Sequence, residues 1–215
     1  SVLHFFEEIG WSCADKILTI SHTMADHLKK EGYDSEVIND PVDPKDFPIG
    51  KEHRDDNTVM FHGTLTRNKN IDVMLDAARL LPKVNFVIIG DGPDSARLRS
   101  IAPKNAYFHG WVPFKDIHTH IAFCTIGVAL RSNNPGNELV LTSPFIQYGV
   151  MGKPCLVTRR KVFGDYPWQF STAKEMADMI EDLLTAEVDS AGMRKVFIDN
   201  YGAEKIAEDI WNLLN

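Results

Sequence analysis

TVMFHGTLTRNKN, residues 58–70, reads as a short apolar strand that ends in a polar loop with one glycine and two cationic side chains. Four further short apolar runs follow at residues 85–89, 106–109, 125–130 and 154–158, and helical apolar spacing comes after each of them. Short apolar strands that alternate with helices predict a parallel sheet covered on both faces. We therefore expect an α/β fold, a Rossmann-like doubly wound parallel sheet, over residues 58–202.

The segments on either side of this sheet follow other patterns. Residues 1–38 predict a small unit with a helix over 1–12, a strand at 16–21, a helix at 23–31 and a strand at 36–38. Residues 39–57 contain three prolines and many turn-forming residues, which predict an irregular linker without regular elements. The apolar spacing of residues 203–215 predicts a final helix.

Composition excludes several classes of partner. Among 215 residues, 30 acidic side chains outnumber 23 basic ones, so the surface as a whole repels nucleic acid and anionic membranes. No apolar run approaches the roughly 20 residues that span a bilayer, so we expect no transmembrane segment. The three cysteines have no metal-ligand spacing, which favours reduced thiols in a cytoplasmic protein. Because the net charge is negative, a phosphate group would need a local binding site.

The loop after the first strand offers such a site. Parallel sheets bind ligands at the carboxyl ends of their strands. Gly63, Arg67, Lys69 and the free amides of the next helix suit an anion, and phosphate is the natural candidate. An ordinary polar loop with solvated cations explains the same residues. The full P-loop pattern is absent, because no Gly-Lys-Ser/Thr follows the first glycine.

The later loops carry weaker signals. Gly90-Asp91-Gly92-Pro93 permits a tight turn, Trp111 and Val112 offer an apolar edge for a base, and residues 131–138 are polar enough to bind sugar. Packing explains each equally well. His62 and His109 lie near strand ends and fit core positions, while His118 and His120 are spaced poorly for a metal pair. No Asp-x-Asp pair ends a strand, so we expect no metal site.

The order of these segments carries a family resemblance. The segments are ADKILTIS at 14–21, NDPVD at 39–43, FHG at 61–63 with Lys69, IIGDGP at 88–93, FHGWV at 108–112 and GKP at 152–154. In order and spacing they resemble the family 4, or group 1, glycosyltransferases of GT-B architecture. The resemblance implies that residues 1–38 end an N-terminal acceptor-binding domain, 39–57 link the domains, 58–202 bind the donor and 203–215 form the C-terminal helix. The rest of the N-terminal domain would be supplied in cis or as a separate chain.

The resemblance also implies roles for individual residues. The resemblance assigns binding of the donor diphosphate to Lys69 and to the backbone near Gly63, Thr64 and Ser143. It places the second glycine turn, Gly90 and Gly92, beside the diphosphate. The nucleobase falls to Trp111 and Val112, and the ribose to Gln147.

Three positions depart from the family pattern. The family has arginine where this chain has Thr64, so Arg67 is expected to supply the second positive charge. The family's paired glutamates fall on Leu139 and Gln147, and Glu138 would replace the first if the loop shifts. The expected catalytic residues are therefore Lys69, Arg67 and Glu138.

A second, more distant resemblance concerns the segment SPFIQY at 143–148. It is similar to the xanthan-type glucuronosyltransferase family, which also has a glutamine there but a lysine in place of Pro144. This resemblance makes a uronic acid donor an option.

The family resemblance implies transfer of a sugar from a nucleoside-diphosphate sugar to a hydroxyl of a sugar or lipid-linked acceptor. We expect retention of configuration, no cofactor and no metal, in the biosynthesis of a glycan, polysaccharide or glycolipid. We expect a cytoplasmic location, with membrane association only through the missing domain. The open alternatives are a non-catalytic domain that binds nucleotide or protein, and a sugar-nucleotide epimerase.

Overall fold

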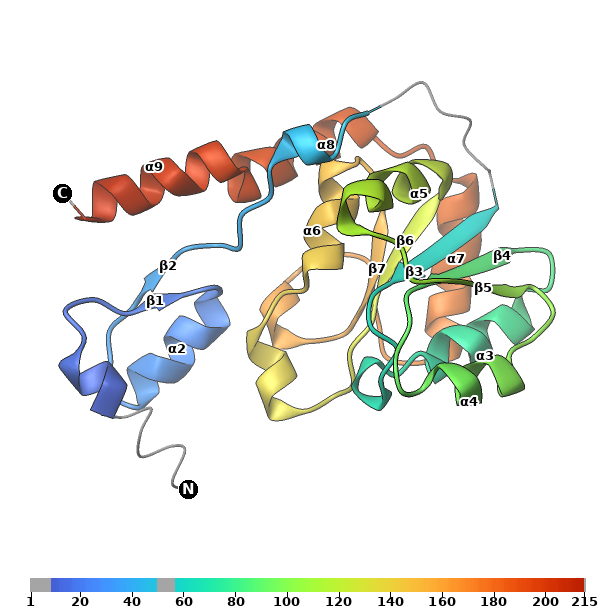
Figure 1. Cartoon of the computed structure of the whole chain (residues 1–215), viewed down its shortest axis with the longest axis horizontal. Helices are drawn as coiled ribbons and strands as arrows, with labels where there is room; N and C mark the ends of the chain where they lie inside the picture. The colour runs from blue at the N-terminus through green and yellow to red at the C-terminus, as the bar shows by residue number, and fades with distance from the viewer. Residues whose placement is uncertain (1–8, 50–56, 215) are drawn as a thin grey trace.

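The computed structural model describes residues 9–49 and 57–214, and a six-stranded parallel sheet forms its centre (Figure 1). The strands, in spatial order, are β5 (Ala106–Gly110), β4 (Asn85–Ile89), β3 (Thr58–His62), β6 (Ile126–Ala129), β7 (Cys155–Thr158) and β8 (Gln169–Phe170). All neighbouring pairs are parallel. The chain enters this sheet at the central strand β3 and continues outward through β4 and β5. It then crosses back to β6, on the other side of β3. This doubly wound order places a crevice at the carboxyl ends of β3 and β6.

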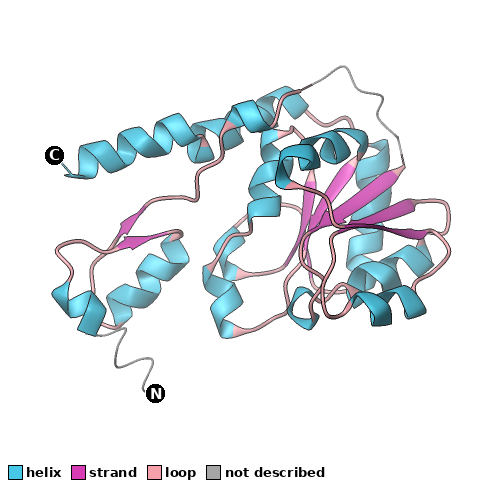
Figure 2. Ribbon diagram, viewed as in Figure 1, coloured by secondary structure: helices cyan, strands magenta, loops and turns pink. Residues whose placement is uncertain are grey.

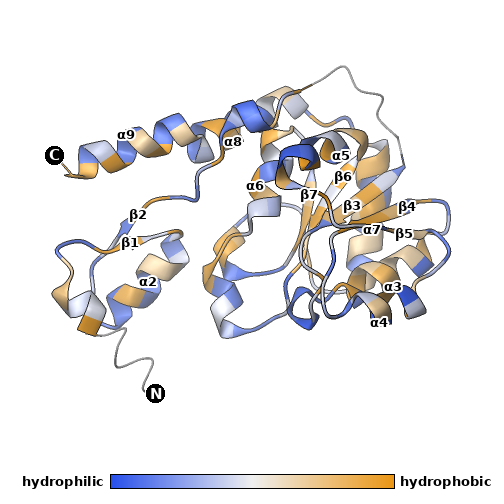
Figure 3. Cartoon of the chain, viewed as in Figure 1, coloured by the Kyte–Doolittle hydropathy of each residue, from blue (hydrophilic) through white to orange (hydrophobic). Residues whose placement is uncertain are grey.

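Helices cover both faces of the sheet (Figure 2). One face packs against α3 (Asp72–Leu80), α4 (Ser95–Ile101) and α7 (Ala173–Thr185). The opposite face packs against α5 (Ile117–Phe123), α6 (Ser143–Val150) and α8 (Ser190–Tyr201). Because both faces are covered, β3 is buried along its whole length, and Figure 3 shows the strands as apolar.

The predicted strands and the α/β class are confirmed. Strand β8 was not predicted, because two residues are too few to show a pattern. A 3-10 turn, η3 (Phe114–Asp116), precedes α5. At the start of helix α7, the Thr172 hydroxyl accepts from the Glu175 amide at 3.2 Å. The Glu175 carboxylate reaches back one residue further than in a standard capping box and accepts from the Ser171 amide at 2.7 Å.

The prediction of an irregular linker over residues 39–57 was wrong in part. Pro44–Asp46 form a 3-10 turn, η1, and Val42 forms a β-bridge to Gly202. The Val42 amide donates to Tyr201 O at 2.8 Å, and Phe47 is only 1% exposed. These two apolar side chains join the core on the α6 and α8 face, which fixes the segment despite its prolines. The predicted linker residues 50–56 lie outside the described residues.

A small N-terminal unit, residues 9–38, precedes this docked segment. It contains a helical stretch at 9–13, β1 (Leu18–Thr19), α2 (His22–Lys30) and β2 (Glu36–Val37), with the two strands parallel. Both strands are shorter than predicted, and most of the predicted helix over 1–12 lies outside the described residues. Helix α9 (Ala203–Leu214) runs from the sheet domain to this unit, where Lys16 Nζ donates to Leu213 O (Figure 1).

The N-terminal unit also contacts the loop before α6. The Ser21 hydroxyl caps α2 by accepting from the Met24 amide at 3.1 Å, and it donates to Leu139 O. Leu139 ends the 3-10 segment η4 (Pro135–Leu139). Among the described residues, no helix is both long and apolar enough to cross a membrane.

Candidate functional site

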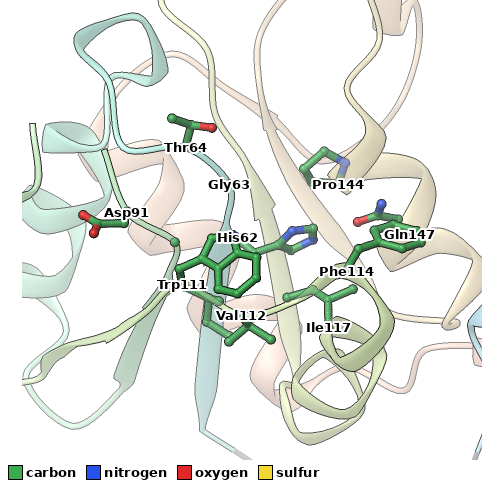
Figure 4. A pocket seen from close by; sticks show the side chains of 12 residues that line it. His62, Gly63, Thr64, Asp91, Trp111, Val112, Phe114, Ile117, Pro144 and Gln147 are labelled. Carbon is green, nitrogen blue, oxygen red and sulfur yellow. The ribbon is translucent and has the colours of Figure 1, made fainter. Parts of the chain in front are cut away.

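A cavity of about 340 Å³ opens at the carboxyl ends of β3 and β4 (Figure 4). Its walls come from the β3 and β4 loops, from the segment after β5, and from α5 and α6. The lining residues are His62, Gly63, Thr64, Ile89, Gly90, Asp91, Trp111, Val112, Phe114, Ile117, Pro144 and Gln147. Six residues that the sequence indicated for binding are thus brought together: Gly63, Thr64, Gly90, Trp111, Val112 and Gln147.

The glycines allow two loops to touch backbone to backbone. Gly63 N donates to Ile89 O at 3.0 Å, and Leu65 N donates to Asp91 O at 2.9 Å. A Cβ on Gly90 would lie 1.9 Å from Gly63 O, and one on Gly92 would lie 2.4 Å from Leu65 O. Gly92 packs on the neighbouring loop and does not line the cavity, so its part in the site is to let the two loops approach each other.

His62 forms the floor of the cavity. Its side chain extends from the end of β3 and points toward the side formed by Pro144 and Gln147 (Figure 4). The ring contacts Tyr148 edge to face at 5.1 Å between centroids. Nε2 is buried and has no hydrogen-bond partner among the described residues. Burial, and then the positive charge of Lys69, lower the pKa of His62 from 6.5 to about 3, so the imidazole is neutral.

One wall of the cavity is apolar and aromatic. Trp111 follows β5 and is 72% exposed, while Phe114 in η3 is 60% exposed. Gln147 lies opposite on α6, and its buried Oε1 has no partner among the described residues. Phe114 and Gln147 also line a smaller adjoining cavity of about 240 Å³, which Ser143 reaches from the start of α6. Ser143 therefore lies at this second cavity, next to the main one.

The segments that follow β3, β6 and β7 carry a cation cluster, which we define as Lys69, Arg131 and Arg160. Asn68 connects the loops that carry it: Ser132 N donates to Asn68 O at 2.7 Å, and Asn137 Nδ2 donates to Asn68 Oδ1 at 3.1 Å. Lys69 follows Asn68 in the chain, and Arg131 precedes Ser132. Hydrogen bonds between two polar loops thus place like charges close together.

The charges of the cation cluster act on one another. Burial, and then Arg131 and Arg160, lower the pKa of Lys69 from 10.5 to about 8. Burial and Arg131 lower the pKa of Arg160 from 12.5 to about 10, against an opposing effect of Glu138. Among the described residues, none of the three cations lies within 4 Å of a carboxylate oxygen. Within the described part of the chain the cluster therefore has no ion-pair partner, and Glu138 offsets only part of its positive charge.

Two of the predicted catalytic residues lie elsewhere. The Arg67 side chain is 74% exposed, and its Nε pairs with Asp94 Oδ1 at 3.2 Å. Glu138 accepts from the Lys161 amide at 2.8 Å and lines a separate cavity of about 290 Å³ between α2 and η4. The structure therefore groups Lys69 with Arg131 and Arg160, and not with Arg67 and Glu138. Arg67 pairs with Asp94, and Glu138 bonds to the Lys161 amide. The sequence positions of Arg67 and Glu138 do not reveal these partners.

Sequence reasoning assigned no individual role to Asn68, Arg131, Asn137 or Arg160, although it named the loop 131–138 as polar enough to bind sugar. A usable signal existed for the two arginines. Arg131 directly follows the predicted strand at 125–130, and Arg160 follows the one at 154–158 by two residues. Basic residues after strands of a parallel sheet meet at its carboxyl edge.

The fold, with a cavity at its switch point, is that of a doubly wound, Rossmann-like α/β domain. The family profile described as "Glycosyl transferases group 1" matches residues 56–186, more than half of the sequence. The chain belongs to the group 1 glycosyltransferase family. No curated protein sequence matches it at a significant level.

Solved structures of low sequence identity share the fold. HepE from Anabaena, in complex with UDP and glucose, superposes with a TM-score of 0.80 at 13% identity, over 96% of this chain and 64% of that chain. Sucrose-phosphate synthase from Thermosynechococcus elongatus gives 0.80 at 15% identity, over 97% and 59%. A TarM variant from S. aureus, bound to UDP, fondaparinux and alpha-GlcNAc-glycerol, gives 0.77 at 15% identity, over 95% and 45%. The chain thus spans less than two thirds of the length of each.

Proposed function

We propose that this chain is the donor-binding part of a glycosyltransferase, which transfers a sugar from a nucleoside-diphosphate sugar to an acceptor hydroxyl. The observation that carries the proposal is the cavity at the β3 and β4 ends, with an aromatic wall and with Lys69 in the same segment after β3 as Gly63 and Thr64. An aromatic wall suits a base, and a cation near a glycine loop suits phosphate. The membership of the chain in a transferase family supports the same activity.

The donor fits the cavity in one direction. The base lies against Trp111 and Val112, and the ribose lies beside Gln147. Gln147 Oε1, which has no partner among the described residues, accepts a hydrogen bond from a ribose hydroxyl. The diphosphate follows along Gly63 and Thr64 toward Lys69. UDP in the HepE and TarM complexes supports a uridine nucleotide as the first candidate.

The chemistry asked of this chain is electrostatic. Departure of the diphosphate builds negative charge on its oxygens, and Lys69 stabilises that charge. We propose transfer without a metal, with retention of configuration. Among residues 9–49 and 57–214, no group of three His, Cys, Asp or Glu side chains is arranged to hold a metal ion. The acceptor, a sugar or lipid-linked sugar in glycan, polysaccharide or glycolipid synthesis, would bind a further N-terminal domain.

The proposal predicts saturable binding of one nucleoside diphosphate, with UDP expected ahead of GDP and ADP, at equal affinity with magnesium or with EDTA. Lys69→Ala should weaken UDP binding about tenfold or more, because a charged hydrogen bond to phosphate is lost. Titration calorimetry measures both. Lys83→Ala is the control, because it removes an exposed lysine before β4, at the edge of the sheet away from the cavity. This variant should bind UDP like the wild type. Failure to bind any of the three nucleotides at millimolar concentration would overturn the proposal.

The pKa of Lys69 predicts how UDP binding depends on pH. Lys69 is mostly protonated at pH 7 and mostly neutral at pH 9.5, because its pKa is about 8. Only the protonated amine attracts phosphate, so UDP affinity should fall by about tenfold between these values. Calorimetry on Lys69→Ala should give an almost flat profile over the same range. An equally steep fall in that variant would assign the effect to another group.

A further inference from the structure

We propose that Lys69, Arg131 and Arg160 form one oxyanion site, which binds an oxyanion of the donor that lies beyond its α-phosphate. This inference rests on the proposed function and adds two residues, Arg131 and Arg160, to the site. The oxyanion is either the β-phosphate or an acidic group on the sugar, and both have the same chemistry of charged oxygens that accept hydrogen bonds.

Hydrogen bonds to the η4 segment and to Val140 position the two arginines, and some of their N–H groups have no partner among the described residues. Arg131 Nη1 donates to Asn137 Oδ1 at 3.3 Å, and Arg160 Nη1 donates to Asn137 O at 2.6 Å and to Val140 O at 2.9 Å. Arg131 Nε and Arg160 Nε and Nη2 are buried without partners among the described residues. Arg160 is only 3% exposed, and its guanidinium lies 4.7 Å from the centre of the Phe163 ring. Such unmet donors in one place are costly unless a ligand pairs with them.

Within the described part of the chain, no carboxylate forms an ion pair with the cluster, and Glu138 offsets only part of the charge on Arg160. Glu138 is the carboxylate of the η4 loop, and it accepts from the Lys161 amide. Asn137, which contacts both arginines, is neutral and donates its own N–H groups to Asn68 and Ser132. Fixed positive charges without a protein counter-ion are prearranged for an anion and need little reorganisation when it arrives.

Lys69 connects the cluster to the cavity, because it lies in the same segment between β3 and α3 as Gly63 and Thr64, which line the cavity. Lys69 influences His62 on the cavity floor, and it is also coupled to both arginines. Asn68 ties the Lys69 loop to the loop that follows Arg131. A donor whose base contacts Trp111 therefore reaches the cluster with its distal groups. Arg67, held by Asp94, does not take part.

The experiment measures how each arginine contributes to binding along a ladder of ligands: UMP, UDP, UDP-glucose and UDP-glucuronic acid. The variants are Arg131→Met and Arg160→Met, and the matched controls are Arg67→Met and the exposed neighbour Arg159→Met. Arg160→Lys keeps a charge at the buried position in case Arg160→Met does not fold, which thermal melting followed by circular dichroism detects. Calorimetry gives the affinities of the full chain for each ligand.

We expect Arg131→Met and Arg160→Met to lower affinity tenfold or more for at least one ligand beyond UMP, and to change UMP affinity less than twofold. A loss that begins with UDP assigns the oxyanion to the β-phosphate. A loss confined to UDP-glucuronic acid assigns it to the sugar. The control variants should stay within twofold of the wild type for all four ligands.

Three results would overturn the inference, and they distinguish its failure from that of the proposed function. If the wild type binds UDP while the cluster variants match it for every ligand, or if Arg67→Met alone causes the loss, the cluster is not an oxyanion site and the proposed function survives. If the wild type binds none of the four ligands, the proposed function fails and the oxyanion site fails with it.

Discussion

Gly90→Ala is expected to destabilise the chain by about 3 to 5 kcal/mol and to abolish nucleotide binding. The new Cβ would lie 1.9 Å from Gly63 O, which is backbone and cannot rotate away. The residue also has φ near 131°, where L side chains are rarely found. Relief of the clash would separate the β3 loop from the β4 loop, and the cavity lies between them. Urea denaturation followed by circular dichroism measures the loss.

Two other glycines provide matched controls. Gly110 also has a positive φ, 95°, but a Cβ added there would meet no described neighbour within 4 Å, so Gly110→Ala should cost only about 1 to 2 kcal/mol. Gly136 has neither a positive φ nor a close contact, so Gly136→Ala should change stability by less than about 0.5 kcal/mol. If Gly90→Ala cost no more than Gly110→Ala, the two loops would not be in the close contact described.

Acid is expected to destabilise the folded chain through His62. Its pKa in the folded state is about 3, below the ordinary 6.5, because of burial and the charge of Lys69. Between these values the unfolded chain binds a proton that the folded chain does not bind. The contribution to stability is therefore full above pH 6.5 and is lost as the pH falls toward 3, at about 1.4 kcal/mol for each unit.

His62→Gln separates this effect from the titration of carboxylates. The wild type should be more stable than the variant at pH 7, because glutamine does not reproduce the ring contact with Tyr148. That advantage should shrink by about 3 kcal/mol between pH 6.5 and 4.5, measured by urea denaturation at each pH. Lys69→Ala removes the second cause of the low His62 pKa, so that pKa should rise. The loss of stability with falling pH should then end at a higher pH than in the wild type. A difference between wild type and His62→Gln that does not change with pH would contradict a neutral, buried histidine.

The sequence was sufficient to predict the sheet because buried parallel strands are apolar along their whole length. Strands β3, β4, β6 and β7 therefore appear directly in the residue pattern, whereas β5 is a partly exposed edge strand that its short apolar run still indicates. The docked segment at 42–47 could not be predicted in the same way. Prolines and turn formers predict the local irregularity correctly, but the burial of Val42 and Phe47 depends on a surface formed by α6 and α8, far along the chain.

The candidate site was predictable where it depends on position after a strand, as for Gly63 and Trp111, and the family resemblance added Gln147 on α6. It was not predictable where it depends on contacts between loops. Arg67 and Lys69 are two residues apart in one loop, yet Asp94 holds the first and Asn68 directs the loop of the second toward Arg131. Family spacing placed a second cation in the β3 loop, whereas the folded chain gathers its cations from the loops after β6 and β7.

The docking of Val42 onto Gly202 limits how far the N-terminal unit can travel. Of the predicted linker of residues 39–57, only three residues, Asn39, Asp40 and Pro41, separate the end of that unit at Ile38 from the first fixed point. A fully extended chain spans at most about 3.5 Å for each residue, so this tether reaches about 14 Å. The side chain of Asn39 also holds this segment, because its Nδ2 donates to Asn200 O at 3.2 Å. Any opening of the N-terminal unit is thus a rotation about a short pivot at the start of α9, with almost no freedom to translate.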